Sequence, residues 1–287
     1  MPKIAQEEKR LVAYVSAALG AMIAVSTLVV SFVFRAPLVI PWDSFLIIGL
    51  MVGLFPPAAV NVIDSTWRAN VDKNIPKFLR EVAEAGRSGL TLTRAIEVSA
   101  ERKYGPLSKE LQQVVTQLSW GISLEECLKS FAERVDTTLG RRTAQLIMEV
   151  SRSGGDVQEV LESINKHIND LYMLARERMS AIRPYIAIIY VAAIIFLFTD
   201  ILLIKSFFTE IANLQLAQKE VATGPLLKIS LDVPTLSKVL FHTAIIQSFF
   251  GGLVAGKMGG GTIGSGLKHC LVLMMVSFLS FVLLVWR

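Results

Sequence analysis

The run Gly251–Lys257, GGLVAGK, has the GxxxxGK spacing of a phosphate-binding loop. In such a loop the backbone and the lysine hold phosphates, and a Ser or Thr that follows holds Mg²⁺. Met258 occupies that last position, and an apolar segment precedes the run where a strand is required. We therefore interpret the glycines as packing residues, because small residues four positions apart let membrane helices approach closely. The packing candidates are Gly252, Gly256, Gly260 and Gly264.

Other catalytic chemistry finds little support in the sequence. His167, His242 and His269 are scattered, and none lies beside a Cys or carboxylate at metal-ligand spacing. The motifs GxSxG, HExxH and CxxC do not occur. Cys127 and Cys270 are too few for a disulfide scaffold, so we expect free thiols. We expect no enzyme activity, no catalytic residue, no cofactor and no metal.

Asp200 is the exception, because it lies inside the apolar run Tyr185–Phe208. An acidic side chain within a membrane helix indicates a functional site by default. Lys205 follows closely, so a structural ion pair or an approach to the outer headgroups would also explain the acid. If Asp200 and Gln247 lined a polar path, the chain would be a small-molecule or ion transporter or channel.

The composition indicates the elements that must carry these residues. The 287 residues are 53% hydrophobic and 18% charged, with a mean hydropathy of +0.53. Soluble domains average about 45–50% apolar and about 25% charged residues, so this is neither a soluble nor a disordered chain. Membrane helices need about 20 apolar residues. Five runs meet or approach that length and predict five transmembrane helices: Leu11–Phe34, Leu38–Val60, Tyr185–Phe208, Val239–Gly256 and His269–Trp286.

The charges divide the chain and predict its orientation. Residues 61–184 hold 18 Lys and Arg and 17 Asp and Glu, nearly in balance. The remaining basic excess is spread beside the apolar runs, whereas nucleic-acid binding requires a basic cluster. We therefore expect no nucleic-acid partner. Lys and Arg favour the cytosolic side of a membrane. Their distribution predicts a plasma-membrane protein with the N-terminus and residues 61–184 in the cytosol and the C-terminus outside.

Helical spacing recurs throughout the charged segment. Ile75, Phe78, Leu79 and Val82 fall at i, i+3, i+4 and i+7, which lines one face of a helix. Glycines separate such segments, and Ser123 with Glu126 forms a capping box. We predict an all-α membrane protein with one cytosolic six-helix bundle. The predicted bundle helices are 75–88, 91–103, 106–119, 124–135, 138–152 and 157–182.

These elements predict three parts of the chain. Residues 1–60 contain the first two membrane helices, and residues 61–184 form the cytosolic domain. Residues 185–287 contain the last three, with an outer loop at 209–238 and a glycine-rich inner turn at 256–268. The helix 157–182 leads directly into the third membrane helix, with Pro184 as the site of a kink. A push on the domain would therefore reach the membrane through a stiff arm.

Three cytosolic segments resemble the type II secretion system F domain. They are KFLREVAEAGRSGLTLTRAI (77–96), LSWGISLEECLKSFAERV (118–135) and AQLIMEVSRSGGDVQEVLESI (144–164). This is the GspF/PilC/TadC/FlaJ family of inner-membrane platform proteins. The tail FFGGLVAGKMGGGTIGSGLKH (249–269) is similar to the archaeal branch, which serves pili and the archaellum.

The resemblance implies a platform without an active site of its own. A cytosolic hexameric ATPase would engage the helical domain, and the platform would help move pilin subunits at the membrane. This chain has one F domain where many platforms have two, which implies a homodimer or a heterodimer with a second F-domain protein. Exposed turns and charges would contact the ATPase, although the same charges could merely solvate the bundle. The expected contact residues are Arg87, Ser88, Gly89, Arg141, Arg142, Arg152 and Gly154.

Three other classes of protein stay open from the residues alone. They are the transporter or channel, a membrane-embedded enzyme, and a sensor or scaffold with a helical cytosolic domain.

Overall fold

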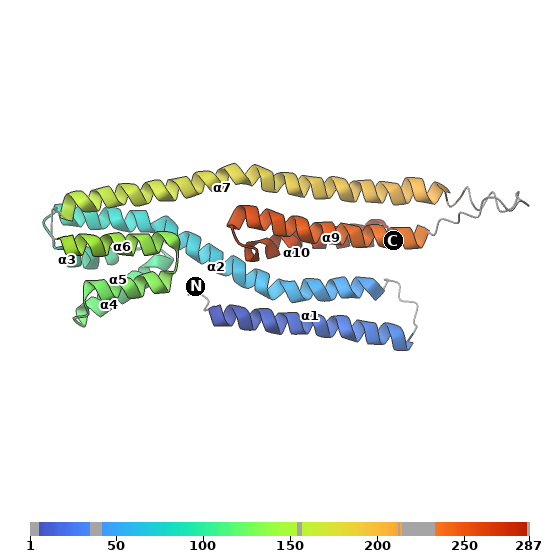
Figure 1. Ribbon diagram of the computed structural model, residues 1–287, viewed down its shortest axis with the longest axis horizontal. Helices are drawn as coiled ribbons and strands as arrows, with labels where there is room; N and C mark the ends of the chain where they lie inside the picture. The colour runs from blue at the N-terminus through green and yellow to red at the C-terminus, as the bar shows by residue number, and fades with distance from the viewer. Residues whose placement is uncertain (1–5, 35–41, 154–156, 212, 214–232, 286–287) are drawn as a thin grey trace, which may run out of the picture. The chain divides into compact units, whose positions relative to one another are not determined.

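The computed structural model describes residues 6–34, 42–153, 157–211, 213 and 233–285. These residues are almost entirely helical, and no strand occurs among them, so the predicted all-α class is confirmed (Figure 1). The elements are α1 (Gln6–Phe34), α2 (Trp42–Arg87), α3 (Leu92–Ala100), α4 (Pro106–Ser119), α5 (Leu124–Val135), α6 (Thr138–Ser153), α7 (Val157–Leu202), the π-helix η1 (Leu203–Phe208), α9 (Val233–Gly260), the 3₁₀-helix η2 (Gly264–Gly266) and α10 (Leu267–Leu284).

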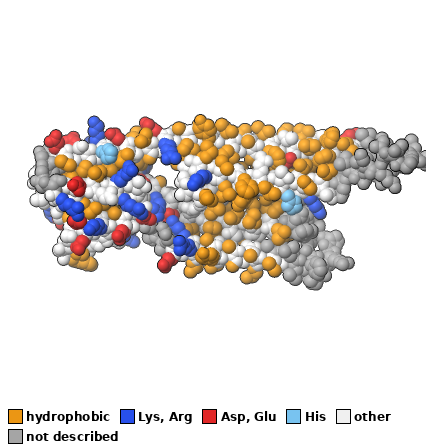
Figure 2. All heavy atoms as spheres, viewed as in Figure 1, with side chains coloured by type: hydrophobic (Ala, Val, Ile, Leu, Met, Phe, Trp, Pro, Cys, Tyr) orange, Lys and Arg blue, Asp and Glu red, His pale blue; other side chains and the backbone are white. Residues whose placement is uncertain are grey.

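The chain divides into two compact units. The bundle unit is Val62–Ala181, and the membrane unit is Gln6–Asn61 together with Ile182–Arg287. Helices α2 and α7 are each 46 residues long, and each contributes residues to both units. Charged side chains gather over the helices of the bundle unit, and hydrophobic side chains gather over those of the membrane unit (Figure 2).

Helix α2 corrects one prediction. We expected a membrane helix ending at Val60 and a separate helix starting at 75, but the helix continues without a break from Trp42 to Arg87. The reason lies in Trp67, Val71 and Ile75, which are spaced four residues apart and are buried in the bundle core. That spacing extends the buried stripe of the helix through the segment that we had left unassigned.

Local signals set the ends of the short bundle helices. Helices α4 and α5 have the predicted bounds, and α6 ends one residue later than expected. Gly121, with φ +81°, ends the turn after α4. Ser123 Oγ then accepts from the Glu126 N–H at 3.3 Å and donates to the Glu126 carboxylate at 3.1 Å. Helix α3 is shorter than predicted, because Glu101 already lies outside it.

The bundle core is apolar and closely packed. Leu79, Val82, Leu107 and Leu161 from three different segments are fully buried. Each such side chain contributes roughly 1.5–3 kcal/mol relative to an exposed position. Cys127 is also buried in this core, and both cysteines of the chain are free thiols, as predicted.

The membrane unit has a smaller core of buried side chains than the bundle unit, and it exposes large apolar side chains. Its core joins Ile47 of α2, Leu197 of α7, Phe241 of α9 and Phe281 of α10, with the two phenylalanine rings 5.2 Å apart. Phe198, Ile194 and many like them are exposed, which suits contact with lipid. Among the described residues, four helices are long and apolar enough to span a membrane: Ser44–Arg87, Glu159–Ile211, Pro234–Gly260 and Gly264–Leu284. The predicted first span, 11–34, falls in α1, where some side chains lie outside the described residues, and it stays a prediction.

Candidate functional site

The turn between α2 and α3 carries three of the predicted contact residues. Arg87 is the last residue of α2, and its guanidinium pairs with the Glu162 carboxylate of α7 at 2.6 Å. Ser88 Oγ donates to the Ala85 carbonyl at 2.7 Å, and Gly89 adopts φ +86°. The turn is therefore tied to the beginning of α7 while its backbone stays at the surface.

Arg152 lies near the end of α6, at the same end of the bundle. Its Nε donates to a Glu125 carboxylate oxygen at 3.3 Å, and Lys129 Nζ lies 3.1 Å from the other oxygen. These hydrogen bonds, with that from Arg152 the larger effect, hold the pKa of Glu125 below its ordinary value. Gly154, the neighbouring predicted contact, lies outside the described residues.

Trp120 belongs to this end of the bundle and was missed by the sequence analysis. It follows α4, five residues before Glu125, and its side chain is 75% exposed. An indole in water is unusual on a compact bundle, because Trp side chains are mostly buried. The available signal was its place directly before the turn glycine Gly121, after the end of α4.

Arg141 and Arg142 lie elsewhere. They lie near the start of α6, whereas Arg152 lies eleven residues after Arg141, which corresponds to about 16 Å along a helix. Arg141 pairs with Asp136, while Arg142 is exposed and forms no ion pair with any described residue. The predicted contact residues therefore form two groups at opposite ends of α6, not one site.

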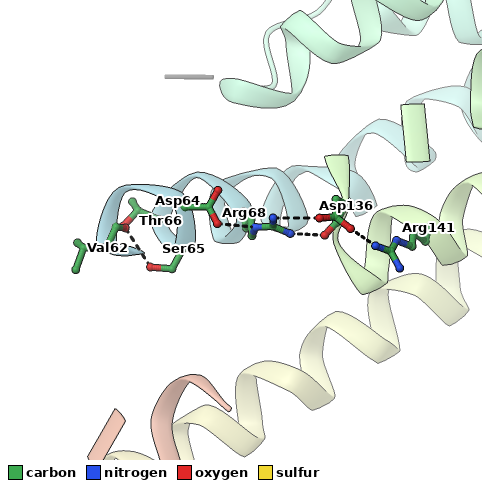
Figure 3. A network of polar contacts seen from close by, with 7 residues as sticks. All are labelled: Val62, Asp64, Ser65, Thr66, Arg68, Asp136 and Arg141. Atoms are coloured by element: carbon green, nitrogen blue, oxygen red, sulfur yellow. Dashed lines mark hydrogen bonds and ion pairs between the residues drawn. The ribbon is translucent and has the colours of Figure 1, made fainter. Parts of the chain in front are cut away.

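A second polar cluster, which we call the junction network, lies where α2 enters the bundle unit (Figure 3). It comprises Asp64, Arg68, Asp136 and Arg141. Arg68 Nε lies 2.9 Å from Asp64 Oδ2, and Arg68 Nη2 lies 3.2 Å from Asp136 Oδ2. Arg68 Nη1 also donates to the Asp136 carbonyl, and Arg141 pairs with the other Asp136 oxygen. The network joins α2 to the turn between α5 and α6.

Asp136 shapes that turn. It ends α5 in the left-handed conformation, with φ +50° and ψ +37°, and is the one non-glycine residue with positive φ among the described ranges. Asp tolerates this conformation better than most residues, because its short side chain can bond locally. Thr137 follows and accepts from the Gly140 N–H at 3.0 Å, which caps the start of α6.

The burial of its charged groups indicates that the junction network stabilises the packing of α2 against the turn between α5 and α6. The Asp64 carboxylate is only 6% exposed and the Arg68 side chain 26%. Charges this deep require partners, since an unpaired buried charge is costly. The sequence showed only the i, i+4 spacing of Asp64 and Arg68. It could not show the link to Asp136, which lies 68 residues beyond Arg68.

No cluster of metal-ligating groups accompanies these sites. In the part of the chain that the structure describes, no group of three or more His, Cys, Asp and Glu side chains could hold a metal ion. The GxxxxGK run lies within the long helix α9, not in a loop after a strand.

Two of the four candidate packing glycines lie against neighbouring backbone, and the other two lie against side chains. A Cβ on Gly252 would overlap the Cys270 backbone, and one on Gly256 would overlap the Gly266 backbone. The same addition at Gly260 would meet the Ser265 side chain, and at Gly264 the Asn61 amide.

Asp200 is buried in the membrane unit. It is 3% exposed and lies on the helix face of Leu197 and Ile204, which pack in the unit's core. Its Oδ2 atom has no hydrogen-bond partner among the described residues. Lys205 is exposed and forms no ion pair with Asp200, so the structure does not show the pairing that we had considered.

Residues 78–204 match the family model of protein F of the type II secretion system. These residues, 127 of the 287, are therefore similar to a type II secretion system F domain. This match confirms the resemblance and covers the end of α2, the short helices α3 to α6, α7 and the first residues of η1. The F domain therefore includes the first membrane-spanning segment after the bundle.

One curated relative is an uncharacterized protein of Methanocaldococcus jannaschii. It is 26% identical over 242 residues, which are 83% of this chain and 38% of that protein. The chain thus spans about two fifths of the relative's length. No solved structure matches the chain.

The F domain and the four apolar helices identify a multi-pass membrane protein. The F domain points to the GspF/PilC-type platform family of secretion and pilus systems. It does not favour the transporter alternative.

Proposed function

We propose that this chain is the membrane platform of a type IV pilus-like or type II secretion-like assembly machine. It couples a cytosolic hexameric ATPase to the movement of pilin subunits at the membrane. The observation that carries the proposal is the continuity of α2 and α7, each of which runs from the bundle unit into the membrane unit without a linker.

Continuous helices transmit displacement. A helix of 46 residues is about 69 Å long and is held by its own backbone hydrogen bonds. From Met173 to Ala181 every side chain of α7 is exposed, so this stretch moves without breaking packed contacts. Pro184 removes one backbone hydrogen bond and is the point where α7 bends most easily. A flexible linker in place of the continuous part of α2 or α7 would absorb the motion instead.

The junction network keeps the turn between α5 and α6 from sliding along α2. Arg68 is bonded both within α2 and to the turn that begins α6. A force on α5 or α6 is therefore passed to α2 through charged hydrogen bonds, which are stronger than neutral ones.

The ATPase surface lies at the end of the bundle where α2 ends and α7 begins. Trp120, Arg87 and Arg152 are exposed there, and Trp and Arg are enriched among residues that dominate binding energies. The ion pairs of Arg87 and Arg152 lie at the surface and contribute little to stability. A partner can therefore replace them with its own contacts at a small cost in free energy. Ser88, Gly89 and Gly154 extend this surface, and Arg142 at the other end is a secondary contact.

The machine needs further components. Pilin-like subunits would contact the exposed apolar side chains of the membrane unit, and a second F-domain chain, identical or not, would complete the platform as a dimer. The positive-inside rule supports a plasma-membrane location with the bundle unit and N-terminus in the cytosol and the C-terminus outside. The system served is of the archaeal pilus or archaellum type.

The test is capture of the ATPase by the full chain. The detergent-purified chain is mixed with the hexameric secretion ATPase encoded nearest to it in its own genome. We expect binding that Arg87→Glu combined with Arg152→Glu abolishes. Arg80→Glu is the matched control, because Arg80 is an exposed, ion-paired arginine in the middle of the bundle segment of α2.

Two results would contradict the proposal. Failure of the folded wild-type chain to bind the ATPase at low salt would remove the coupling role. Equal loss with Arg80→Glu would show a general charge effect and remove the assigned surface.

A further inference from the structure

Three exposed basic side chains lie at one end of the membrane unit. They are Arg183 on α7, Lys257 on α9 and Lys268 in the first turn of α10, and we call them the basic rim. None of them forms an ion pair with a described residue. Basic side chains of the bundle unit, by contrast, are often paired, as Arg87 and Arg152 are.

Contacts between the helices bring the rim together. Ile186, one turn after Arg183, lies where it would touch a side chain at Gly259, two residues after Lys257. One turn further along α7, the Tyr190 hydroxyl lies 2.7 Å from Nδ1 of His269, the neighbour of Lys268. The three helices therefore present their cations at the same level.

The spacing of charges along the helices matches a bilayer. On α9, Lys238 precedes Lys257 by 19 residues, or about 28 Å. Along α7 and η1, Arg183 precedes Lys205 by 22 residues, or about 33 Å. The hydrocarbon core of a bilayer is about 30 Å thick. The rim thus lies at one headgroup level, and Lys205 and Lys238 lie at the other.

Acidic side chains do not balance the rim. Residues 233–285, which contain α9 and α10, include no Asp or Glu, and Asp200 and Glu210 belong to the far half of α7 and beyond. The start of α1 adds two acidic and two basic residues and leaves the balance unchanged. Among the described residues, none of these three cations is paired with an acidic side chain, so an anionic ligand can supply the counter-charge.

The turn between the two lysines suits the boundary between headgroups and acyl chains. Ile263 is 63% exposed at this turn, and Ser265 fixes the turn by bonding the Gly256 and Thr262 carbonyls. An apolar side chain between cations inserts among acyl chains while the cations reach phosphates. The Tyr190–His269 pair supplies the amphipathic rings that are favoured at this depth.

We propose that the basic rim, with the turn that carries Ile263, binds the phosphate headgroups of anionic phospholipids in the bilayer. This inference does not depend on the ATPase or on pilins. It gives the membrane unit a lipid preference at one leaflet and fixes the level at which α7 and α9 sit.

The experiment uses the full chain in nanodiscs of phosphatidylcholine that contain a minor fraction of phosphatidylglycerol. Mass spectrometry of the lipids retained after detergent extraction measures the enrichment of phosphatidylglycerol over phosphatidylcholine. Each rim cation removed should lower the affinity about fivefold. Arg183→Gln, Lys257→Gln and Lys268→Gln together should lower it on the order of a hundredfold.

Three controls decide the outcome. The charge-conserving variant Arg183→Lys with Lys257→Arg and Lys268→Arg should retain the enrichment, which excludes misfolding as the cause of a loss. The double variant Lys205→Gln with Lys238→Gln should leave the enrichment of phosphatidylglycerol unchanged. Inorganic phosphate should not displace the lipid. Wild-type enrichment in the neutral triple variant, equal loss at the other end, or displacement by free phosphate would each overturn the proposal.

Discussion

Replacing Arg68 by Ala tests the junction network directly. The change removes the guanidinium that bonds Asp64, Asp136 and the Asp136 carbonyl. Breaking a fully buried pair costs about 3–5 kcal/mol, and losing an exposed pair costs about 0.2–1 kcal/mol. Because Arg68 is about a quarter exposed, we expect a cost of about 2 kcal/mol, confined to the contact between α2 and the α5–α6 turn.

Hydrogen exchange of the full chain measures this local cost. Opening of the α5–α6 turn should become about 30-fold more frequent, because 1.4 kcal/mol corresponds to a factor of ten. Peptides that cover Asp136 to Gly140 should show the faster exchange, and those in α9 and α10 should not. Global melting is less informative, because a chain with two units need not unfold in one step.

Arg80→Ala is the matched control, since Arg80 forms an i, i+4 pair on α2 with a side chain that is 73% exposed. It should change exchange by less than about threefold. A double-mutant cycle with Asp136→Asn should then give a coupling energy of about 1 kcal/mol or more. If Arg68→Ala and Arg80→Ala have the same effect, the network is an ordinary surface feature and the transmission argument built on it fails.

Three further outcomes are expected. Gly256→Val should destabilise the α9–α10 hairpin severely in a detergent melting assay, because its side chain would overlap the Gly266 backbone, whereas Gly251→Ala, with its nearest neighbour at 3.6 Å, should be mild. Burial raises the pKa of Tyr104 to about 12, so an ultraviolet titration of the wild type should contain a late component that Tyr104→Phe removes. Since the folded pKa lies above the unfolded one, the stabilisation is complete below about pH 10 and is lost as pH rises towards 12. Arg142→Cys should react with a membrane-impermeant maleimide only after cells are opened, and labelling of intact cells would reverse the proposed orientation.

The short bundle helices were predictable because their ends are set locally. Ser123 with Glu126, Gly121 and the Gly105–Pro106 pair each fix a boundary within a few residues of sequence. The start of the bundle's first helix was not predictable from charge alone. The change in composition near Val60 looked like a boundary, whereas the backbone continues through it.

The candidate surface stays a prediction. Arg87 and Arg152 were proposed from their charge and their places in turns, but the separation of Arg152 from Arg141 and Arg142 along α6 required the fold. Trp120 was overlooked because an aromatic residue next to a helical segment is usually assigned to the core. The junction network joins residues far apart in the sequence, so periodicity could not reveal it.

The presence of two continuous helices has a mechanical consequence. A body attached by a single helix can swivel about that helix axis, and nothing in the lipid need respond. A body attached by both α2 and α7 cannot swivel freely, because torque about either axis must drag the other helix sideways. If the proposed ATPase turns the bundle unit, part of that rotation would become lateral or tilting movement of α2 or α7 within the bilayer.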